Sequence, residues 1–160
     1  MGSLQLSPRN SLNSPEGIAV DSQGTVFIAD WGNHRILQIN SQGDFSRGIG
    51  GFGTNSSVDP GAFVKFVFPT RVAVLEDAEG MNVNGNLHYR ESYLCVADQN
   101  GIHICKLNGE YLGTLLAPDK NFSPGSFYAF IIQGYGKNSK LHLVNRHGDL
   151  LGTVFELAAN

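Results

Sequence analysis

A pattern that occurs twice in the chain constrains its fold more than any other sequence feature. The first copy opens at residues 15–21 with Pro-Glu-Gly-Ile-Ala-Val-Asp, and a run that ends in Ala-Asp follows at 25–30. The second copy opens at Pro69, and its own run ending in Ala-Asp lies at 93–98. Short apolar segments rich in β-formers and bounded by turn residues are typical of β-strands. The chain is therefore expected to consist of repeated units of short strands.

Each copy contains four expected strands joined by tight turns. In the first copy, segments 35–39 and 45–49 follow the Ala-Asp run, with Ser-Gln-Gly-Asp between them. In the second copy, segments 102–107 and 111–116 are separated by Asn-Gly. A weaker third copy begins at Pro124, and its expected strands lie at 127–133, 140–144 and 150–155. A repeat of about 40–55 residues with four strands per unit is the signature of propeller blades.

The predicted fold is all-β: a β-propeller segment of about three four-stranded antiparallel blades, half of a six-bladed propeller. The blades are expected at about 14–60, 61–117 and 118–160, after a disordered leader or cloning remnant at 1–13. The second blade carries a polar surface insertion at Glu76–Arg90. Propellers have about 4–8 blades, so three are not expected to close a ring alone. A homodimer that closes the propeller, an open arc and a fragment of a longer chain are the alternatives.

The composition excludes several classes of protein. Glycine accounts for 20 of the 160 residues, which suits many tight turns. Hydrophobic residues make up 41% and charged residues 16%, unlike a disordered chain. The net charge of −3 argues against a nucleic-acid footprint. No apolar run approaches the roughly 20 residues of a membrane helix, and residues 1–7 lack the cationic and apolar regions of a signal peptide.

The two main copies also carry a family resemblance. The opening Pro-x-Gly-Ile-Ala-Val-Asp, the following Ile-Ala-Asp and the Asn-His-Arg-Ile of residues 33–36 resemble the NHL repeat. The glycine-rich segment that closes on residues 61–63 and Pro69 is similar to that family's blade-to-blade connection. The resemblance covers about residues 14–116 and implies an NHL-type propeller.

Within that family, the chain looks most like the lyase domain of peptidyl-α-hydroxyglycine amidating enzymes. The similarity lies in Leu-Cys-Val-Ala-Asp at 94–98 followed by Ile104 and Cys105, and it implies a disulfide between Cys95 and Cys105. A hairpin centred near Asn100 would also place the two cysteines opposite each other, about 4.5–5.5 Å apart, which a disulfide can span. The alternative is two buried free cysteines.

The positions that work in the lyase are not retained here. The family holds zinc with histidines, one of which follows a blade-opening proline, where this chain has Glu16 and Thr70. Trp31 stands near the place of the family's catalytic tyrosine, and Gln99 stands in place of its substrate-binding arginine. Glutamine lacks the charge and rigid fork that hold a carboxylate. We therefore expect no catalytic residue, no metal and no cofactor. A lyase whose remaining blades lie outside this chain is the alternative function.

A disulfide would imply an oxidising compartment. Two glycosylation sequons, at Asn55 and Asn121, indicate the same compartment, and both fall in expected loops. The sequence therefore predicts a secreted or lumenal glycoprotein.

The predicted function is a non-enzymatic scaffold that binds a protein or peptide partner through loops on one propeller face, with RNA binding as a third possibility. Asp30 and Asp98 end matching strands and are expected to accept backbone N–H bonds in turns rather than act as general bases. Trp31 is expected either to anchor a partner or to pack between blades. The predicted partner-binding face comprises Glu16, Trp31, Asn33, Thr70, Arg71, Gln99 and Asn100.

Overall fold

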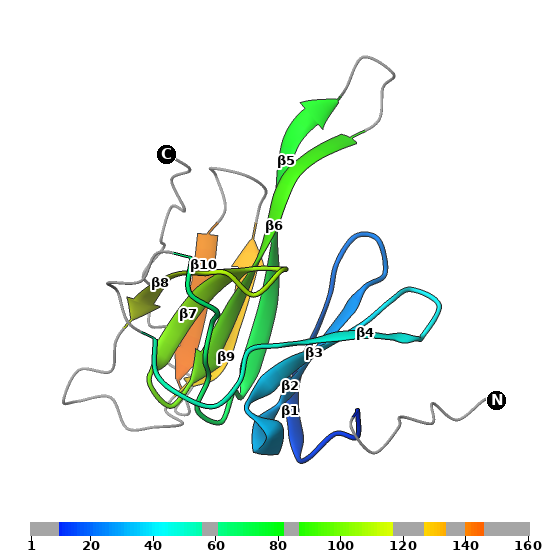
Figure 1. Ribbon diagram of the computed structural model, residues 1–160. Helices are drawn as coiled ribbons and strands as arrows, with labels where there is room; N and C mark the ends of the chain where they lie inside the picture. Colours follow the sequence, from blue (N-terminus) through cyan, green and yellow to red (C-terminus); the bar gives the residue numbers. More distant parts are fainter. Residues whose placement is uncertain (1–9, 56–60, 82–86, 117–126, 134–139, 146–160) are drawn as a thin grey trace.

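The computed structural model describes residues 10–55, 61–81, 87–116, 127–133 and 140–145, and it confirms the all-β prediction (Figure 1). The first sheet contains β1 (Pro15–Val20), β2 (Val26–Asp30), β3 (Arg35–Ile39) and β4 (Phe45–Ile49). The second contains β5 (Arg71–Met81), β6 (Leu87–Asp98), β7 (Gly101–Lys106) and β8 (Tyr111–Leu116). Each sheet is an antiparallel meander in chain order, and we call these sheets blade one and blade two.

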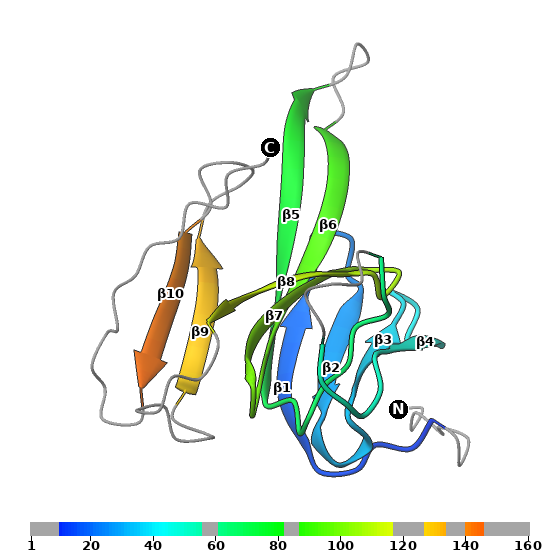
Figure 2. The same cartoon turned by 60° about the vertical axis from the view of Figure 1, so that its left-hand side comes forward.

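A two-stranded hairpin follows blade two. It pairs β9 (Phe127–Gln133) with β10 (Lys140–Asn145), and both strands match the expected third copy. The expected strand at 150–155 lies outside the described residues. β9 lies beside β5, as β5 lies beside β1, so the first strands of successive units are neighbours (Figure 2). This arrangement is that of a partial β-propeller.

The insertion at Glu76–Arg90 has more structure than a loop. β5 and β6 continue through it as a ribbon that projects beyond the other strands of blade two (Figure 1). Glu76 pairs with Ser92 and Met81 pairs with Leu87, with bulges along the way. Two antiparallel strands satisfy half of each other's backbone groups, and the outer groups can face water, so the ribbon needs no third strand.

The core lies between blade one and blade two. Side chains alternate along a strand, so one face of blade one carries Phe27, Ala29 and Ile36 toward the neighbouring blade. The connecting segment adds Phe66, which fills the space beside Gly50. The buried members are Phe27, Ala29, Ile36, Ile49, Val64, Phe66, Val72, Leu94, Val96 and Cys105. Burial of this apolar surface holds the two blades together.

The two cysteines do not form the predicted disulfide, and both are buried free thiols. The hairpin pairs Cys95 with Ile104 and Leu94 with Cys105, one residue away from the expected register. A shift of one residue moves a side chain to the other face of the sheet. Cys105 therefore packs in the core with blade one, whereas Cys95 lies on the opposite face. Burial raises the pKa of both thiols to about 12.

β1 and β5 approach closely at Gly17. A Cβ atom added there would lie 2.7 Å from the carbonyl oxygen of Thr70 and 3.0 Å from the Cα of Arg71. Both are backbone atoms that cannot rotate away. Glycine at this position thus allows the first strands of the two blades to lie side by side.

Gly17→Val is expected to lower the free energy of unfolding by about 1–3 kcal/mol, because the added side chain forces β1 and β5 apart. Urea denaturation monitored by tryptophan fluorescence would measure the change. Gly113→Ala is the matched control, since a Cβ at Gly113 in β8 has no atom within 4 Å. Equal stability of the two variants would contradict the close approach of these strands.

The cysteines give a second prediction. Thiol titration of protein purified without reductant should find two reactive thiols in denaturant and none that react rapidly in the native state near neutral pH. The native thiols are buried and protonated, and only the thiolate reacts readily. Because the folded pKa of both thiols is raised, stability should also fall as the pH rises above the ordinary thiol value. If the denatured protein had no titratable thiols, the two cysteines would be disulfide-bonded, and the finding of free thiols would be contradicted.

Candidate interaction site at one end of the blades

The partner-binding residues predicted from sequence gather at one end of the blades, the lower end in Figure 1. β1 and β5 start at this end, β2 and β6 finish there, and the 3₁₀ turn η1 (Trp31–Asn33) connects β2 to β3. The seven residues lie in three places. Glu16 and Arg71 are in the first strands and Thr70 directly precedes β5, Trp31 and Asn33 are in η1, and Gln99 and Asn100 form the β6–β7 turn.

Asp30 organises this end of blade one. Its side chain is fully buried, and the Nε of Arg35 lies 2.8 Å from Oδ2 as an ion pair. The Nδ2 of Asn33 donates to the same oxygen at 2.8 Å, and the backbone N–H of Asn13 donates to Oδ1 at 2.7 Å. A buried carboxylate is tolerated when it is paired and hydrogen-bonded in this way. Asp30 accepts a backbone N–H bond as predicted, but the donor is Asn13, before β1, rather than a residue of the turn after β2.

Asp98 has the same place in blade two. The backbone N–H of Val67 donates to Oδ2 at 2.8 Å and that of Asn100 donates to Oδ1 at 2.7 Å. Asn13 and Val67 each stand two residues before the proline that opens their blade. In both blades, then, a buried aspartate at the end of the second strand holds the segment that leads into the first strand. The repeat seen in the sequence is a repeat of this interaction.

His103 replaces arginine as the ionisable partner in blade two. Its Nε2 lies 2.8 Å from Oδ1 of Asp98, and its Nδ1 lies 2.9 Å from the hydroxyl of Thr114. That hydroxyl lies 2.7 Å from the hydroxyl of Tyr111. Asp98 and His103 are buried, so the acid–imidazole–hydroxyl order faces the protein interior. This chain of hydrogen bonds ties β6, β7 and β8 together, and each polar group within it has a partner.

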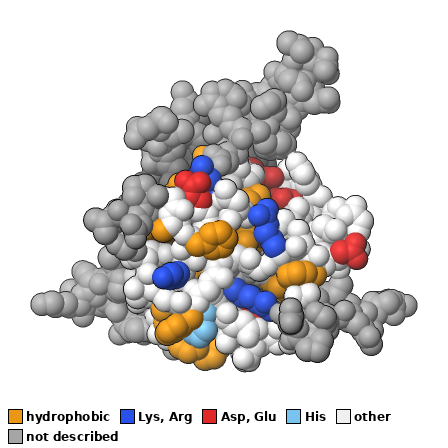
Figure 3. Space-filling model, in the orientation of Figure 1, with side chains coloured by type: hydrophobic (Ala, Val, Ile, Leu, Met, Phe, Trp, Pro, Cys, Tyr) orange, Lys and Arg blue, Asp and Glu red, His pale blue; other side chains and the backbone are white. Residues whose placement is uncertain are grey.

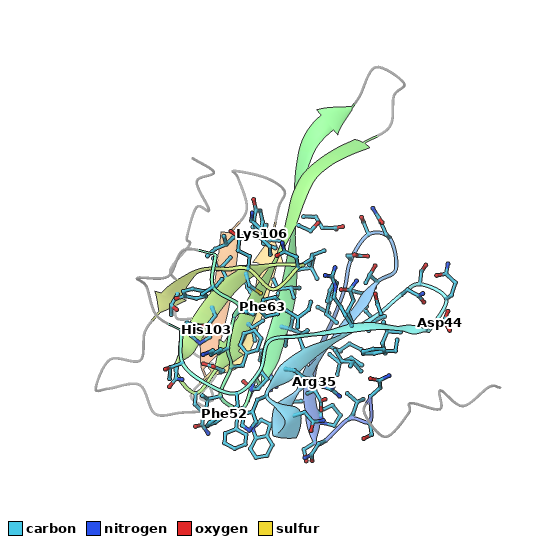
Figure 4. All side chains as sticks on the ribbon, in the orientation of Figure 1. Arg35, Asp44, Phe52, Phe63, His103 and Lys106 are labelled. Atoms are coloured by element: carbon cyan, nitrogen blue, oxygen red, sulfur yellow. The ribbon has the colours of Figure 1, made fainter. Side chains whose placement is uncertain are left out.

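Four aromatic side chains form a continuous cluster beside η1, which we call the aromatic ledge: Trp31, His34, Phe52 and Phe68. Trp31 stacks on Phe68 with ring centres 4.3 Å apart. His34 contacts Phe68 at 4.4 Å and Phe52 at 4.8 Å. Phe52 is 71% exposed, and Figure 4 labels it at the lower end of the molecule. Figure 3 shows hydrophobic side chains beside a histidine at the same end. Exposed aromatic side chains are enriched at contact surfaces, so the aromatic ledge is the candidate site at this end of the blades.

The backbone under the aromatic ledge is strained. His34 has φ 52° and Phe68 has φ 55°, in the left-handed region that costs a side chain of this kind about 1–2 kcal/mol per residue. The backbone N–H of Phe68 donates to Nδ1 of His34 at 3.1 Å, so the two strained residues hold each other. Since this nitrogen accepts, the neutral ring carries its hydrogen on Nε2. Ser14, which precedes Pro15 as Phe68 precedes Pro69, has φ 52° as well, so the conformation at Phe68 recurs at the opening of both blades.

Several of the predicted contact residues also make contacts within the fold, and their role in binding stays a prediction. Asn33 also donates to the backbone oxygen of Ser11 at 3.0 Å. Arg71 donates through Nη1 to the backbone oxygen of Thr70 at 2.7 Å and to that of Glu16 at 3.4 Å, and the Glu16 carboxylate lies 3.8 Å away. These contacts bridge the starts of β1 and β5. Trp31, by contrast, both packs on Phe68 and keeps part of its ring exposed.

Sequence reasoning did not select three of the four residues of the aromatic ledge. His34, Phe52 and Phe68 come from three separate segments, and they meet only because the connection between the blades folds back over η1. A local signal exists for Phe68, which directly precedes Pro69. The residue before a proline is excluded from the right-handed helical region, which marks this position as conformationally special.

The structure describes the asparagine of one of the two sequons. The Asn55 side chain bonds the backbone of Lys65 in both directions: Nδ2 donates to its oxygen at 2.9 Å, and Oδ1 accepts from its N–H at 2.7 Å. A glycan on Asn55 would be attached to this same Nδ2. Asn121 lies outside the described residues. Glycosylation and a secreted or lumenal origin stay predictions that rest on the sequons, since no disulfide is present.

Comparison with known proteins supports the repeat. The NHL repeat family model matches residues 12–39, which span β1, β2, η1 and β3 together with the Asp30 site. No curated protein matches this chain significantly. The NHL part of the resemblance is therefore supported, and the amidating-enzyme part has no relative to support it.

Metal binding and membrane insertion can also be considered for the residues that the structure describes. Among these residues, no group of three or more histidine, cysteine, aspartate or glutamate side chains is placed to hold a metal ion. Within the same ranges, no helix has the length and apolar character needed to cross a bilayer. The fold and the family match together define a partial β-propeller that carries an NHL repeat.

Asp30→Ala is expected to lower the free energy of unfolding by about 2–4 kcal/mol, because it removes the buried carboxylate that accepts from Arg35, Asn33 and the backbone of Asn13. Thermal and urea denaturation would measure the loss. Asp44→Ala is the control, since Asp44 is exposed at the β3–β4 turn (Figure 4) and should cost less than about 0.5 kcal/mol. If Asp30→Ala lowered the free energy of unfolding no more than the control does, the stabilising role of Asp30 would be contradicted.

Proposed function

We propose that the chain is a non-enzymatic interaction module that binds a protein or peptide partner through the aromatic ledge. The observation that carries this proposal is the cluster itself: Phe52, 71% exposed, extends the Trp31–Phe68 stack through His34 into solvent. The NHL repeat match supports an interaction module in general terms. The family match does not specify a binding surface or a kind of partner, and these two points are what we propose.

The energetics of binding favour this surface over the charged residues around it. Aromatic residues are enriched among the few side chains that carry most of the energy of an interface. Here the ring of His34 is held by the backbone N–H of Phe68, and the ring of Phe68 is stacked on Trp31, so little side-chain freedom is left to lose on binding. The charged neighbours Arg35 and Arg71 already bond to Asp30 and to the β1–β5 junction. The expected partner therefore presents an apolar or aromatic side chain rather than a cluster of acidic groups.

The charges of the site also separate this proposal from RNA binding. Stacked aromatic rings can receive bases, but single-stranded nucleic acid is held mainly by a basic groove that follows the phosphates. Arg35 at this end is neutralised by the buried Asp30, and the whole chain has a net charge of −3. A protein or peptide partner needs no such groove. The proposed partner is accordingly a polypeptide.

Phe52→Ala and Trp31→Ala should each weaken partner binding by at least about tenfold, the loss expected for a central aromatic anchor. The purified chain would capture a partner from a cell extract, and calorimetry with that partner would then give the dissociation constants. Phe52 is mostly exposed, so its removal should leave the melting temperature unchanged.

Leu112→Ala is the matched control, because Leu112 is an exposed apolar residue on β8, outside the aromatic ledge. Wild-type affinity in both ledge variants would assign the interaction to another surface. A captured partner that proved to be RNA, with affinity falling steeply as salt rises, would replace the proposal with nucleic-acid binding.

A further inference from the structure

The connection between the blades has a buried side and an exposed side. Val64 and Phe66 are buried in the shared core, whereas Phe63 is 62% exposed and Lys65 is also exposed. Side chains alternate in this way along an extended segment. The two outward residues, together with the exposed Phe52 that precedes them in the chain, form what we call the connection face: Phe52, Phe63 and Lys65.

Backbone hydrogen bonds hold the connection on both of its edges. The N–H of Val64 donates to the carbonyl oxygen of Gly109 in blade two at 2.8 Å, and the N–H of Phe66 donates to that of Gly51 at 2.8 Å. Because both edges are occupied, a ligand cannot add a strand here, and recognition falls to the outward side chains. A platform that is fixed in this way loses little backbone freedom on binding.

The side chains of the connection face lie close to one another. The Lys65 stem crosses Gly53, where an added Cβ atom would lie 2.8 Å from Cδ of Lys65, and Gly53 directly follows Phe52. The ring of Phe63 lies over Gly109, where an added Cβ atom would be 2.7 Å from a ring carbon. Figure 4 labels Phe52 and Phe63, and Figure 3, in the same orientation, shows basic side chains among the hydrophobic ones on this side of the molecule. The face thus combines two exposed rings with a cation.

The charge of Lys65 is not neutralised by a carboxylate of the described residues. The ion pairs in this part of the chain include Arg35 with Asp30 at 2.8 Å and Lys106 with Glu110 at 3.1 Å, and none of them involves Lys65. A single carboxylate is the complement of a single exposed ammonium group, whereas single-stranded nucleic acid needs a basic groove along its phosphates. The charge of the connection face therefore favours an acidic peptide over RNA.

We propose that the connection face binds an extended segment of the partner in which one acidic side chain is flanked by apolar ones. The carboxylate pairs with Lys65, and the apolar side chains pack on Phe63 and Phe52. Phe63 and Lys65 are two residues apart on one side of an extended segment, so an extended ligand beside them matches with alternate residues, in the order apolar-x-acidic-x-apolar. This inference rests on the proposed function for the class of partner, a polypeptide, and the two surfaces share Phe52. Phe63 and Lys65 belong to the connection face alone.

The probe is the fluorescent peptide Ser-Leu-Ser-Glu-Ser-Leu-Ser, compared with the versions that carry Gln or Lys in place of Glu. Fluorescence anisotropy with the full chain should give a dissociation constant for the Glu peptide about two- to fivefold below that of the Gln peptide, the factor expected of an exposed ion pair. Added salt should reduce this preference. Phe63→Ala should raise the dissociation constant of the Glu peptide at least about fivefold, because it removes an exposed aromatic anchor.

Reversal of the charge at Lys65 gives the sharpest comparison. Lys65→Glu should invert the preference, so that the Lys peptide binds more tightly than the Glu peptide, and Lys65→Arg should retain the wild-type order. Leu112→Ala is the matched control for Phe63→Ala, since Leu112 is exposed on β8 and its removal should leave all three dissociation constants unchanged. If the Glu peptide did not bind the wild-type chain, or if Lys65→Glu did not invert the preference, the proposal would be overturned.

Trp31→Ala separates this inference from the proposed function. Trp31 belongs to the aromatic ledge and lies outside the connection face, so its removal should leave the preference among the three peptides intact. Partner capture that needs Trp31 but tolerates Phe63→Ala and Lys65→Glu would support the aromatic ledge and overturn the connection face. A uridine oligonucleotide that displaces the Glu peptide at lower concentrations than the unlabelled peptide does would also overturn it, in favour of nucleic acid.

Discussion

A buried carboxylate at the end of the second strand is the interaction on which each blade depends. Asp30 and Asp98 both accept a backbone N–H from the segment that enters the first strand, and each has one basic or imidazole partner from the third strand. A single side chain thereby joins the second and third strands of a blade to the segment that enters its first strand, which lies 17 residues away in blade one and 31 residues away in blade two. The cost of burying the charge is offset only when all of these donors are present. The geometry of the end where the aromatic ledge lies follows from this requirement.

The sequence predicts the strands well because their signals are local. Alternating β-formers, prolines at blade openings and tight turns such as Asn-Gly are read within a few residues, and the expected strands at 35–39, 45–49 and 111–116 have the observed bounds. The register of the β6–β7 hairpin is a different matter. It depends on whether the turn is centred on Asn100 or, as the structure has it, between Gln99 and Asn100. That difference of half a residue separates a disulfide from two thiols on opposite faces.

The candidate site is harder to predict from the sequence, because its residues come from separate segments of the chain. Trp31 and Asn33 lie in a motif that the sequence displays, but the aromatic ledge is completed by residues from the connection between the blades. Its formation depends on the left-handed conformations of His34 and Phe68, which only the surrounding packing imposes. Sequence patterns identify the end of the blades at which the site lies. The assembled structure identifies which side chains at that end are exposed and which bond to the rest of the fold.

The opposite orientation of the two cysteines makes each a separate reporter on blade packing. Cys105 is enclosed between blade one and blade two, whereas Cys95 is buried on the face turned toward the β9–β10 side. The order in which the two thiols become accessible during unfolding therefore records which contact opens first. Early exposure of Cys105 would show the first two blades separating as rigid units, and early exposure of Cys95 would show the last unit peeling away. The chain therefore contains a natural thiol probe on each side of blade two, and no further cysteine has to be introduced.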